Sequence, residues 1–235
     1  AVARSVTTTA VIARTVEAIV QQVGLGRRVA ALERRLDAST PTEIIGVGDP
    51  IRQVRDAIRR AADDGRAPVL IVGPPGAGKK LAAANIHRLS RRRSDGPLLT
   101  GACGRLAADA LGTVIFGHFQ RLENGRNRET KGWVDEARGG VLVLEGLSAA
   151  DDTVVSALVD CLRTGFFQRA GGGRSVEAAV QLVVCITADG PSVGASGRVP
   201  GALIEKEGGI EIRLPALRER IEDIPLLAQY ALQNK

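Results

Sequence analysis

Apolar strands and amphipathic helices alternate along most of this chain. Short runs that are apolar on nearly every position occur at residues 68–72 (PVLIV), 141–144 (VLVL) and 180–187 (VQLVVCIT). Helical spacing of apolar positions is found at residues 51–62, 79–89 and 153–162. Strands buried on both faces and separated by helices are typical of parallel βαβ units. The pattern predicts an α/β domain, a parallel sheet flanked by helices, over residues 41–235.

The first forty residues show a different pattern. Apolar or small side chains recur three and four positions apart, at Val6, Thr9, Ala13, Val16, Val20 and Val23. This is the spacing of a coiled-coil seam. Two interpretations stay open, namely an amphipathic helix that packs on its own domain and a dimerising helix that links an upstream domain to the rest. We expect residues 1–40 to form a helical linker. Because the sequence contains no methionine, we also expect it to be part of a longer chain.

Composition narrows the class of protein. The 235 residues are 44% hydrophobic and 25% charged, values typical of a globular domain. No apolar run approaches the roughly 18 residues of a membrane span, so we expect no membrane association. Three cysteines and two histidines give neither a disulfide framework nor a zinc spacing. We therefore expect a cytoplasmic protein without a structural metal.

A phosphate-binding loop follows the first apolar run. Residues 73–80 read GPPGAGKK, which is the P-loop pattern G-x-x-x-x-G-K between a strand and a helix. In such a loop the backbone N–H groups and the helix N-terminus converge on phosphate oxygens, and Lys79 would reach the β- and γ-phosphates. The sequence thus predicts a nucleotide site. A tight turn with an exposed lysine is the alternative interpretation.

Position 80 departs from the usual P-loop pattern. A Ser or Thr normally follows the loop lysine, and its hydroxyl helps to hold Mg²⁺. Lys80 cannot ligate a cation. We hypothesise that it places a second positive charge near the phosphates and partly substitutes for the metal.

The net charge of +6 raises the question of nucleic acid. The densest basic run, residues 88–93 (RLSRRR), has no interleaved aromatic side chains. We interpret it as a solvated helix end and do not expect direct DNA binding by this chain. A phosphate site with two lysines explains part of the surplus.

The order of motifs along the chain carries a family resemblance. The motifs are residues 45–46 (IG), 73–80 (GPPGAGKK), 85–90 (NIHRLS), 115–118 (IFGH), 139–144 (GGVLVL) and 214–225 (LPALRERIEDIP). Together they resemble the AAA+ domain of sigma-54-dependent bacterial enhancer-binding transcription activators. The resemblance implies a P-loop AAA+ sheet, ATP or ADP as ligand, and ring-forming oligomers that hydrolyse nucleotide between subunits.

Several positions differ from what this family carries. The family ends the strand after Gly-Gly with Asp-Glu, where Asp supports Mg²⁺ and Glu polarises the attacking water; the chain has Glu145 and Gly146 there. The loss of a positioned base typically costs about 10²–10⁴-fold in rate. The sensor position, usually Thr-Asn, corresponds to Ile186 and Thr187. The resemblance therefore implies that the hydrolytic machinery is degraded.

Two loops of the family are also altered. The sigma-contacting loop GAFTGA corresponds to residues 121–126 (RLENGR), and Pro200 and Lys206 stand where trans-acting arginines are expected. An arginine finger is worth about 10³–10⁵ in rate. The helical lid would begin near Ile224, so we expect it to be absent or truncated in this chain.

The sequence thus predicts a nucleotide-binding AAA+ regulatory module of a bacterial transcription regulator. We expect it to be deficient in hydrolysis, without action on sigma-54, and to control oligomeric state. Its expected partners are a second copy through the N-terminal helix, or a ring, with DNA bound by a domain elsewhere and RNA polymerase as a further partner. An active ATP-hydrolysing activator and a scaffold that binds no nucleotide remain the alternatives. The expected nucleotide-binding residues are Ile45, Gly46, Gly73, Pro74, Pro75, Gly76, Ala77, Gly78, Lys79, Lys80, Leu81 and Glu145, with Mg²⁺ doubtful.

Overall fold

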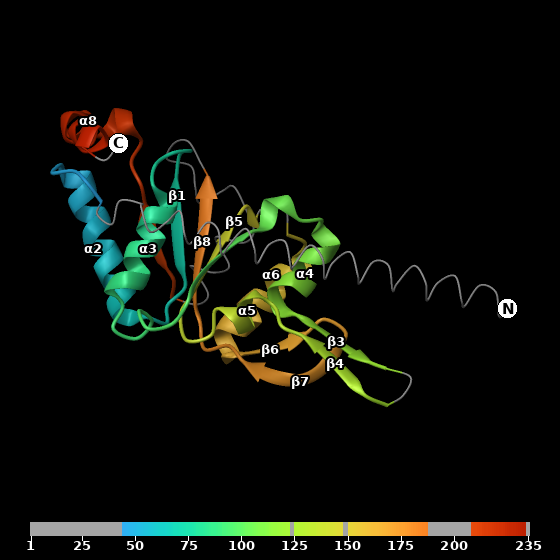
Figure 1. Cartoon of the computed structure of the whole chain (residues 1–235). Coiled ribbons are helices and arrows are strands. Elements are labelled where there is room, and N and C mark those ends of the chain that lie inside the picture. The colour runs from blue at the N-terminus through green and yellow to red at the C-terminus, as the bar shows by residue number, and fades with distance from the viewer. Residues whose placement is uncertain (1–43, 123–124, 148–149, 188–207, 234–235) are drawn as a thin grey trace. The chain divides into compact units, whose positions relative to one another are not determined.

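A computed structural model describes residues 44–122, 125–147, 150–187 and 208–233 (Figure 1). The expected helical linker at residues 1–40 and the expected trans-acting positions Pro200 and Lys206 lie outside these residues. All statements below concern the described part of the chain.

The centre of the domain is a five-stranded sheet with the strand order β2-β5-β8-β1-β9. Its strands are β1 (Val69–Gly73), β2 (Leu98–Ala102), β5 (Val141–Glu145), β8 (Gln181–Thr187) and β9 (Ile210–Arg213). All neighbouring pairs in this sheet are parallel. Parallel neighbours need crossover connections, and in most of this chain those crossovers are helices.

Helices cover both faces of the sheet. Side chains alternate between the two faces along each strand, so neighbouring strand residues belong to different cores. Ile71 and Val143 belong to the core formed with α2 (Asp49–Asp64) and α3 (Lys79–Leu89). Leu70 and Leu144 belong to the opposite core. The helices of that second face are α4 (Ala108–Phe116), α5 (Trp133–Glu136) and α6 (Asp152–Thr164).

Two β-hairpins lie together beside the sheet, on the side of α5 (Figure 1). They consist of β3 (His118–Arg121) with β4 (Asn127–Thr130), and of β6 (Phe166–Arg169) with β7 (Gly172–Glu177). An isolated bridge between His118 and Ala170 joins them. The guanidinium of Arg169, with its side chain 8% exposed, lies 2.9 Å from Asp135 of α5 and 3.7 Å from Glu129 of β4. This buried arginine therefore ties both hairpins to α5.

The C-terminal segment contains short helices. These are η4 (Leu217–Glu219), η5 (Ile221–Asp223) and α8 (Ile224–Gln233). One further short helix, η1 (Cys103–Arg105), lies elsewhere in the chain, directly after β2. No helix in the described part of the chain is long and apolar enough to cross a membrane.

The α/β class and the main elements predicted from the sequence are confirmed. The three apolar runs are β1, β5 and β8, and the three predicted helices are α2, α3 and α6. The prediction omitted β2, β9, α4, α5 and both hairpins. The reason is visible in β9, whose sequence IEIR alternates apolar and charged residues, as suits a strand at the edge of a sheet. Such a short alternation carries little signal by itself.

One residue of the motif at 85–90 and one of the basic run at 88–93 make structural contacts. A ring nitrogen of His87 lies 2.8 Å from the Gly96 carbonyl oxygen. Arg93 donates hydrogen bonds to the carbonyl oxygens of Gly65 and Ala179, at 2.8 and 2.9 Å. The last arginine of the basic run therefore joins two loops of the fold.

Candidate nucleotide-binding site

The P-loop connects β1 to α3 in an open conformation. Gly76 and Gly78 have left-handed φ angles of 76° and 94°, which glycine adopts at little cost. Gly78 is the N-cap of α3, and its carbonyl oxygen accepts the first helical hydrogen bond from Ala82 at 2.9 Å. A methyl group built on either glycine would meet no atom of the described residues within 4 Å. At these two positions the described part of the chain therefore leaves room beside the loop.

The loop lysine is held at the base of this turn. Lys79 Nζ donates hydrogen bonds to the carbonyl oxygens of Gly73 and Pro74, each at 2.9 Å. An ammonium group, the N-terminus of an eleven-residue helix and an open glycine turn are the features that phosphate oxygens require. The residues present therefore fit the phosphates of a nucleotide.

A second lysine faces the end of the neighbouring strand. Lys80 Nζ lies 3.3 Å from Glu145 Oε2, with side chains 63% and 26% exposed. Glu145 is the last residue of β5, and its register partner on β8 is Cys185. Cys185 belongs to the core packed against α3, so the alternation along the strands directs Glu145 to the face on which α3 lies.

Mg²⁺ does not fit these residues. The position after the loop lysine offers an ammonium group, which has no lone pair for a metal. The carboxylate of Glu145 already faces that ammonium. Among the described residues, no group of three or more His, Cys, Asp or Glu side chains is placed to hold a metal ion.

The thiols beside this carboxylate are kept protonated. Burial raises the pKa of Cys185 to about 12, and the negative charge of Glu145 adds to the effect. Burial likewise raises the pKa of Cys103 to about 12, again with a contribution from Glu145. Since a thiolate is the reactive form of cysteine, neither thiol is activated for chemistry. Cys185 is a core residue, 4% exposed.

The residue after Glu145 is fitted to a narrow space. Gly146 has φ +68°, and a Cβ built on it would lie 2.9 Å from the backbone nitrogen of Gly104 and 3.1 Å from its Cα. The backbone conformation and the close approach both favour glycine here. Sequence reasoning identified the missing carboxylate at this position but not its neighbour Gly104, which follows β2.

The Ile45–Gly46 segment is anchored by residues that sequence reasoning did not assign to the site. Gly46 has φ +146°, and a Cβ on it would lie 2.5 Å from Asp223 Oδ2. Asp223 Oδ1 accepts a hydrogen bond from the Val47 backbone N–H at 2.7 Å. Arg55 donates to the carbonyl oxygens of Ile44 and Gly46, at 2.6 and 2.7 Å. The only signal for Asp223 was its place within the motif at residues 214–225.

The positions predicted for the site thus fall into two groups. The P-loop residues, Lys80 and Glu145 lie together where β1 and β5 end and α3 begins. Gly46 instead lies against Asp223 of η5, which accepts a hydrogen bond from the backbone N–H of the next residue, Val47, and Ile45 precedes it. Leu81 lies within the first turn of α3 and is partly buried.

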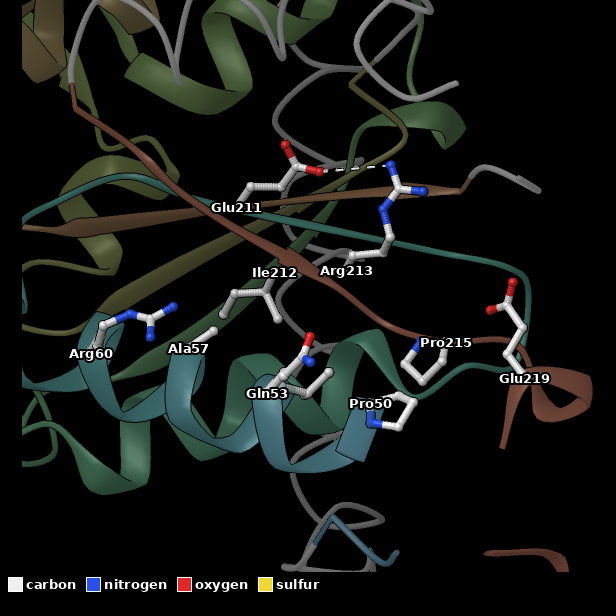
Figure 2. Close-up of a pocket in the computed structure, with 10 residues that line it drawn as sticks. Pro50, Gln53, Ala57, Arg60, Glu211, Ile212, Arg213, Pro215 and Glu219 are labelled. Carbon is white, nitrogen blue, oxygen red and sulfur yellow. Dashed lines mark ion pairs between the residues drawn. The ribbon is translucent and has the colours of Figure 1, made fainter. Parts of the chain in front are cut away.

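A separate cavity of about 330 Å³ lies between α2 and the edge strand β9 (Figure 2). Its lining includes Gln53 and Arg60 of α2, Ile212 of β9, and Glu219. Figure 2 draws these side chains together with the Glu211–Arg213 ion pair of the same lining, whose atoms are 4.0 Å apart. None of the P-loop residues lines this cavity, so it is distinct from the candidate phosphate site.

Comparison with known proteins agrees with this geometry. Residues 44–206 match the family described as the Sigma-54 interaction domain. The Nif-specific regulatory protein of Herbaspirillum seropedicae is 31% identical over 91% of this chain and 41% of its own length. The Psp operon transcriptional activator of Escherichia coli is 34% identical over 69% of this chain and 50% of its own length. The chain therefore spans half or less of the length of these relatives.

A solved structure supports the same assignment. The crystal structure of NtrX from Brucella abortus in complex with ADP has a TM-score of 0.68 and 26% identity, covering 90% of this chain and 46% of that one. NtrX has also been crystallised in complex with ATP, with a TM-score of 0.66. The motifs, the sheet with its P-loop and the family match all agree, and the chain belongs to the Sigma-54 interaction domain family, the AAA+ module of sigma-54-dependent transcriptional activators.

Proposed function

We propose that this domain binds ATP or ADP without hydrolysing it at a useful rate, and that it regulates the oligomeric state of a bacterial transcription regulator. The observation that carries the proposal is a contrast within one site. The P-loop has the geometry of a phosphate site, whereas the position of the water-activating carboxylate is occupied by Gly146.

Nucleotide binding is supported by the open P-loop and by Lys79. No described residue lies within 4 Å of a Cβ built on Gly76 or Gly78, and the Lys79 ammonium is positioned at the base of the loop. The similarity to NtrX, crystallised with ADP and with ATP at 26% identity, favours the same ligands here.

Loss of hydrolysis is supported by the end of β5. A glutamate at position 146 would have to take a left-handed φ and would press on the backbone of Gly104. A glutamate at position 146 could therefore be accommodated only if the segments that contain Gly104 and Gly146 moved apart. The altered trans-acting positions Pro200 and Lys206 add to this on sequence grounds alone, since they lie outside the described residues.

Loss of action on sigma-54 is supported by the β3–β4 hairpin. Its end corresponds to the GAFTGA loop of the family, but Arg121 and Arg126 stand there, and both are exposed. The apolar aromatic tip of the family's loop is thus replaced by charged side chains in this chain. The domain would then act as a repressor or with a different sigma factor. Its partners would be RNA polymerase and a DNA-binding domain elsewhere in the protein. We place this activity in the cytoplasm.

The decisive experiment combines nucleotide binding with turnover. The purified chain is titrated with ADP and with ATP by calorimetry, and steady-state ATPase activity is measured at saturating ATP. We expect binding of both nucleotides and no turnover above background. At a ligand concentration one hundred times Kd, the unfolding free energy rises by about 2.7 kcal/mol, so a thermal melt gives a second measure of binding.

A matched pair of lysine variants makes this experiment specific. Lys79→Ala removes the ammonium of the P-loop, whereas Lys131→Ala removes an exposed ammonium from the turn between β4 and α5. Binding should be lost in the first and kept in the second. ATP turnover that Lys79→Ala abolishes would instead identify an active ATPase, and a flat melt with both nucleotides would identify a scaffold. Native mass spectrometry with and without nucleotide reports the change in subunit number.

A further inference from the structure

The ion pair between Lys80 and Glu145 occupies the two positions at which a P-loop protein holds its metal. In P-loop nucleotide hydrolases the residue after the loop lysine is a Ser or Thr, and an acidic residue at the end of a neighbouring strand completes the metal site. Here Lys80 lies in the first turn of α3, directly after Lys79, and Glu145 ends β5. Their charged atoms are 3.3 Å apart.

This arrangement opposes a divalent cation on simple electrostatic grounds. Mg²⁺ requires oxygen ligands in near-octahedral geometry at about 2.0–2.1 Å, and Lys80 provides none. A metal ligated by Glu145 Oε2 would lie close to the Lys80 ammonium, which is 3.3 Å from that oxygen, and two positive charges at short range repel each other. A metal bound to Glu145 would therefore have to displace Lys80 first.

The same arrangement suits a phosphate group without metal. Lys80 is held from one side by Glu145 and is otherwise largely exposed, with 63% of its side chain accessible. Its other N–H groups are therefore accessible to phosphate oxygens, and an ammonium has three such donors. Lys79 and the N-terminus of α3 add a second ammonium group and a helix dipole at the same βα turn.

We propose that the Lys80–Glu145 ion pair replaces the metal ion, so that this site binds the phosphates of ADP or ATP in the absence of Mg²⁺. The proposal rests on the nucleotide binding proposed above and defines its chemistry. Glu145 acts as the positioning residue, and Lys80 is the residue that contacts phosphate.

The test measures ADP affinity by calorimetry in excess EDTA and again in excess Mg²⁺. For the unaltered chain we expect the ratio of the two Kd values to be about 1. The variant Lys80→Thr restores the usual hydroxyl and removes the ammonium. Its affinity in EDTA should fall by about tenfold or more, because a charge-assisted hydrogen bond is lost. Combined with Glu145→Asp, the same variant should regain affinity when Mg²⁺ is added.

Two controls separate the possible results. Lys131→Thr makes the same change of side chain on an exposed turn and should leave both Kd values unaltered, and the melting temperature of each variant checks folding. If the unaltered chain binds ADP only with Mg²⁺, or if Lys80→Thr binds equally well in EDTA, the metal-replacing role is wrong and nucleotide binding stands. If the unaltered chain binds under neither condition, the proposed function fails as well.

Discussion

Asp223 accepts a hydrogen bond from the backbone N–H of Val47 at 2.7 Å, across 176 positions of the sequence. The same carboxylate lies against Gly46, where any side chain would collide with it. Asp223 is fully buried. Two motifs that are far apart in the chain, at residues 45–46 and 214–225, therefore form one structural unit.

Removal of this carboxylate should weaken both the fold and nucleotide binding. Asp223→Ala removes the charged acceptor of the Val47 N–H, and a hydrogen bond to a charged group contributes about 1.5–3 kcal/mol. We expect a loss of this size in the free energy of unfolding, measured by urea denaturation. We also expect weaker ADP binding, because Ile45 and Gly46 lose their anchor. Asp63→Ala, an exposed aspartate on α2, should change stability by about 0.5 kcal/mol or less; equal effects of the two variants would contradict the anchoring role.

Two glycine-to-alanine variants distinguish the stability cost of the Gly146–Gly104 contact from the cost of a left-handed φ alone. Gly165 has φ +74° and no atom of the described residues within 4 Å of a built Cβ, whereas Gly146 has φ +68° and a built Cβ on it lies 2.9 Å from the backbone nitrogen of Gly104. Gly165→Ala should cost about 1 kcal/mol for the left-handed conformation alone. Gly146→Ala should cost at least about 2 kcal/mol, because the backbone of Gly104 must also move. Urea denaturation of both variants measures the difference, and equal costs would show that Gly104 yields freely.

The buried arginine that joins the hairpins should be far more important for stability than a surface arginine. Arg169→Met leaves the carboxylate of Asp135, whose side chain is 10% exposed, without its charged partner. Breaking a buried pair in this way costs about 3–5 kcal/mol. Arg163→Met removes an ion pair with Asp160 in which both side chains are more than 60% exposed, and such pairs contribute about 0–1 kcal/mol. The comparison is made by thermal and urea denaturation, and similar losses would refute the structural role of Arg169.

Stability should fall in alkaline solution because the three cysteines are buried. Burial raises the pKa of Cys161 to about 11 and that of Cys103 and Cys185 to about 12, from an ordinary value of 9.0. Above pH 9 the unfolded chain releases these protons and the folded chain keeps them, so the unfolded state binds fewer protons. Stability is then fully present below pH 9 and is lost as the pH rises toward the folded pKa values, by about 1.4 kcal/mol per pH unit for each thiol.

A single substitution tests this dependence. The free energy of unfolding is measured in urea from pH 8 to pH 10.5 for the unaltered chain and for Cys185→Ala. The slope above pH 9 should be shallower in the variant by the contribution of one thiol, because the variant lacks that titrating group. Identical slopes would mean that Cys185 ionises as readily in the folded state as in the unfolded state.

The sequence by itself determined the α/β class and the P-loop. The strands β1, β5 and β8 are apolar throughout because both faces of the sheet are covered, and that pattern is visible in the sequence without any tertiary information. The P-loop is likewise a local feature, since its glycines and Lys79 act through the turn on which they lie. The altered residues at positions 80, 145 and 146 could also be identified from the order of motifs.

Tertiary structure alone decided which of these residues meet. Lys80 and Glu145 belong to different βα units, and only the parallel order β5-β8-β1 brings their charged atoms to 3.3 Å. Gly146 faces Gly104 because β2 pairs with β5, and Asp223 reaches Val47 through the path of the chain after β9. Periodicity reports which side of an element is buried but not which element covers it. The contacts that define the site arise from strand order, a long-range property of the fold.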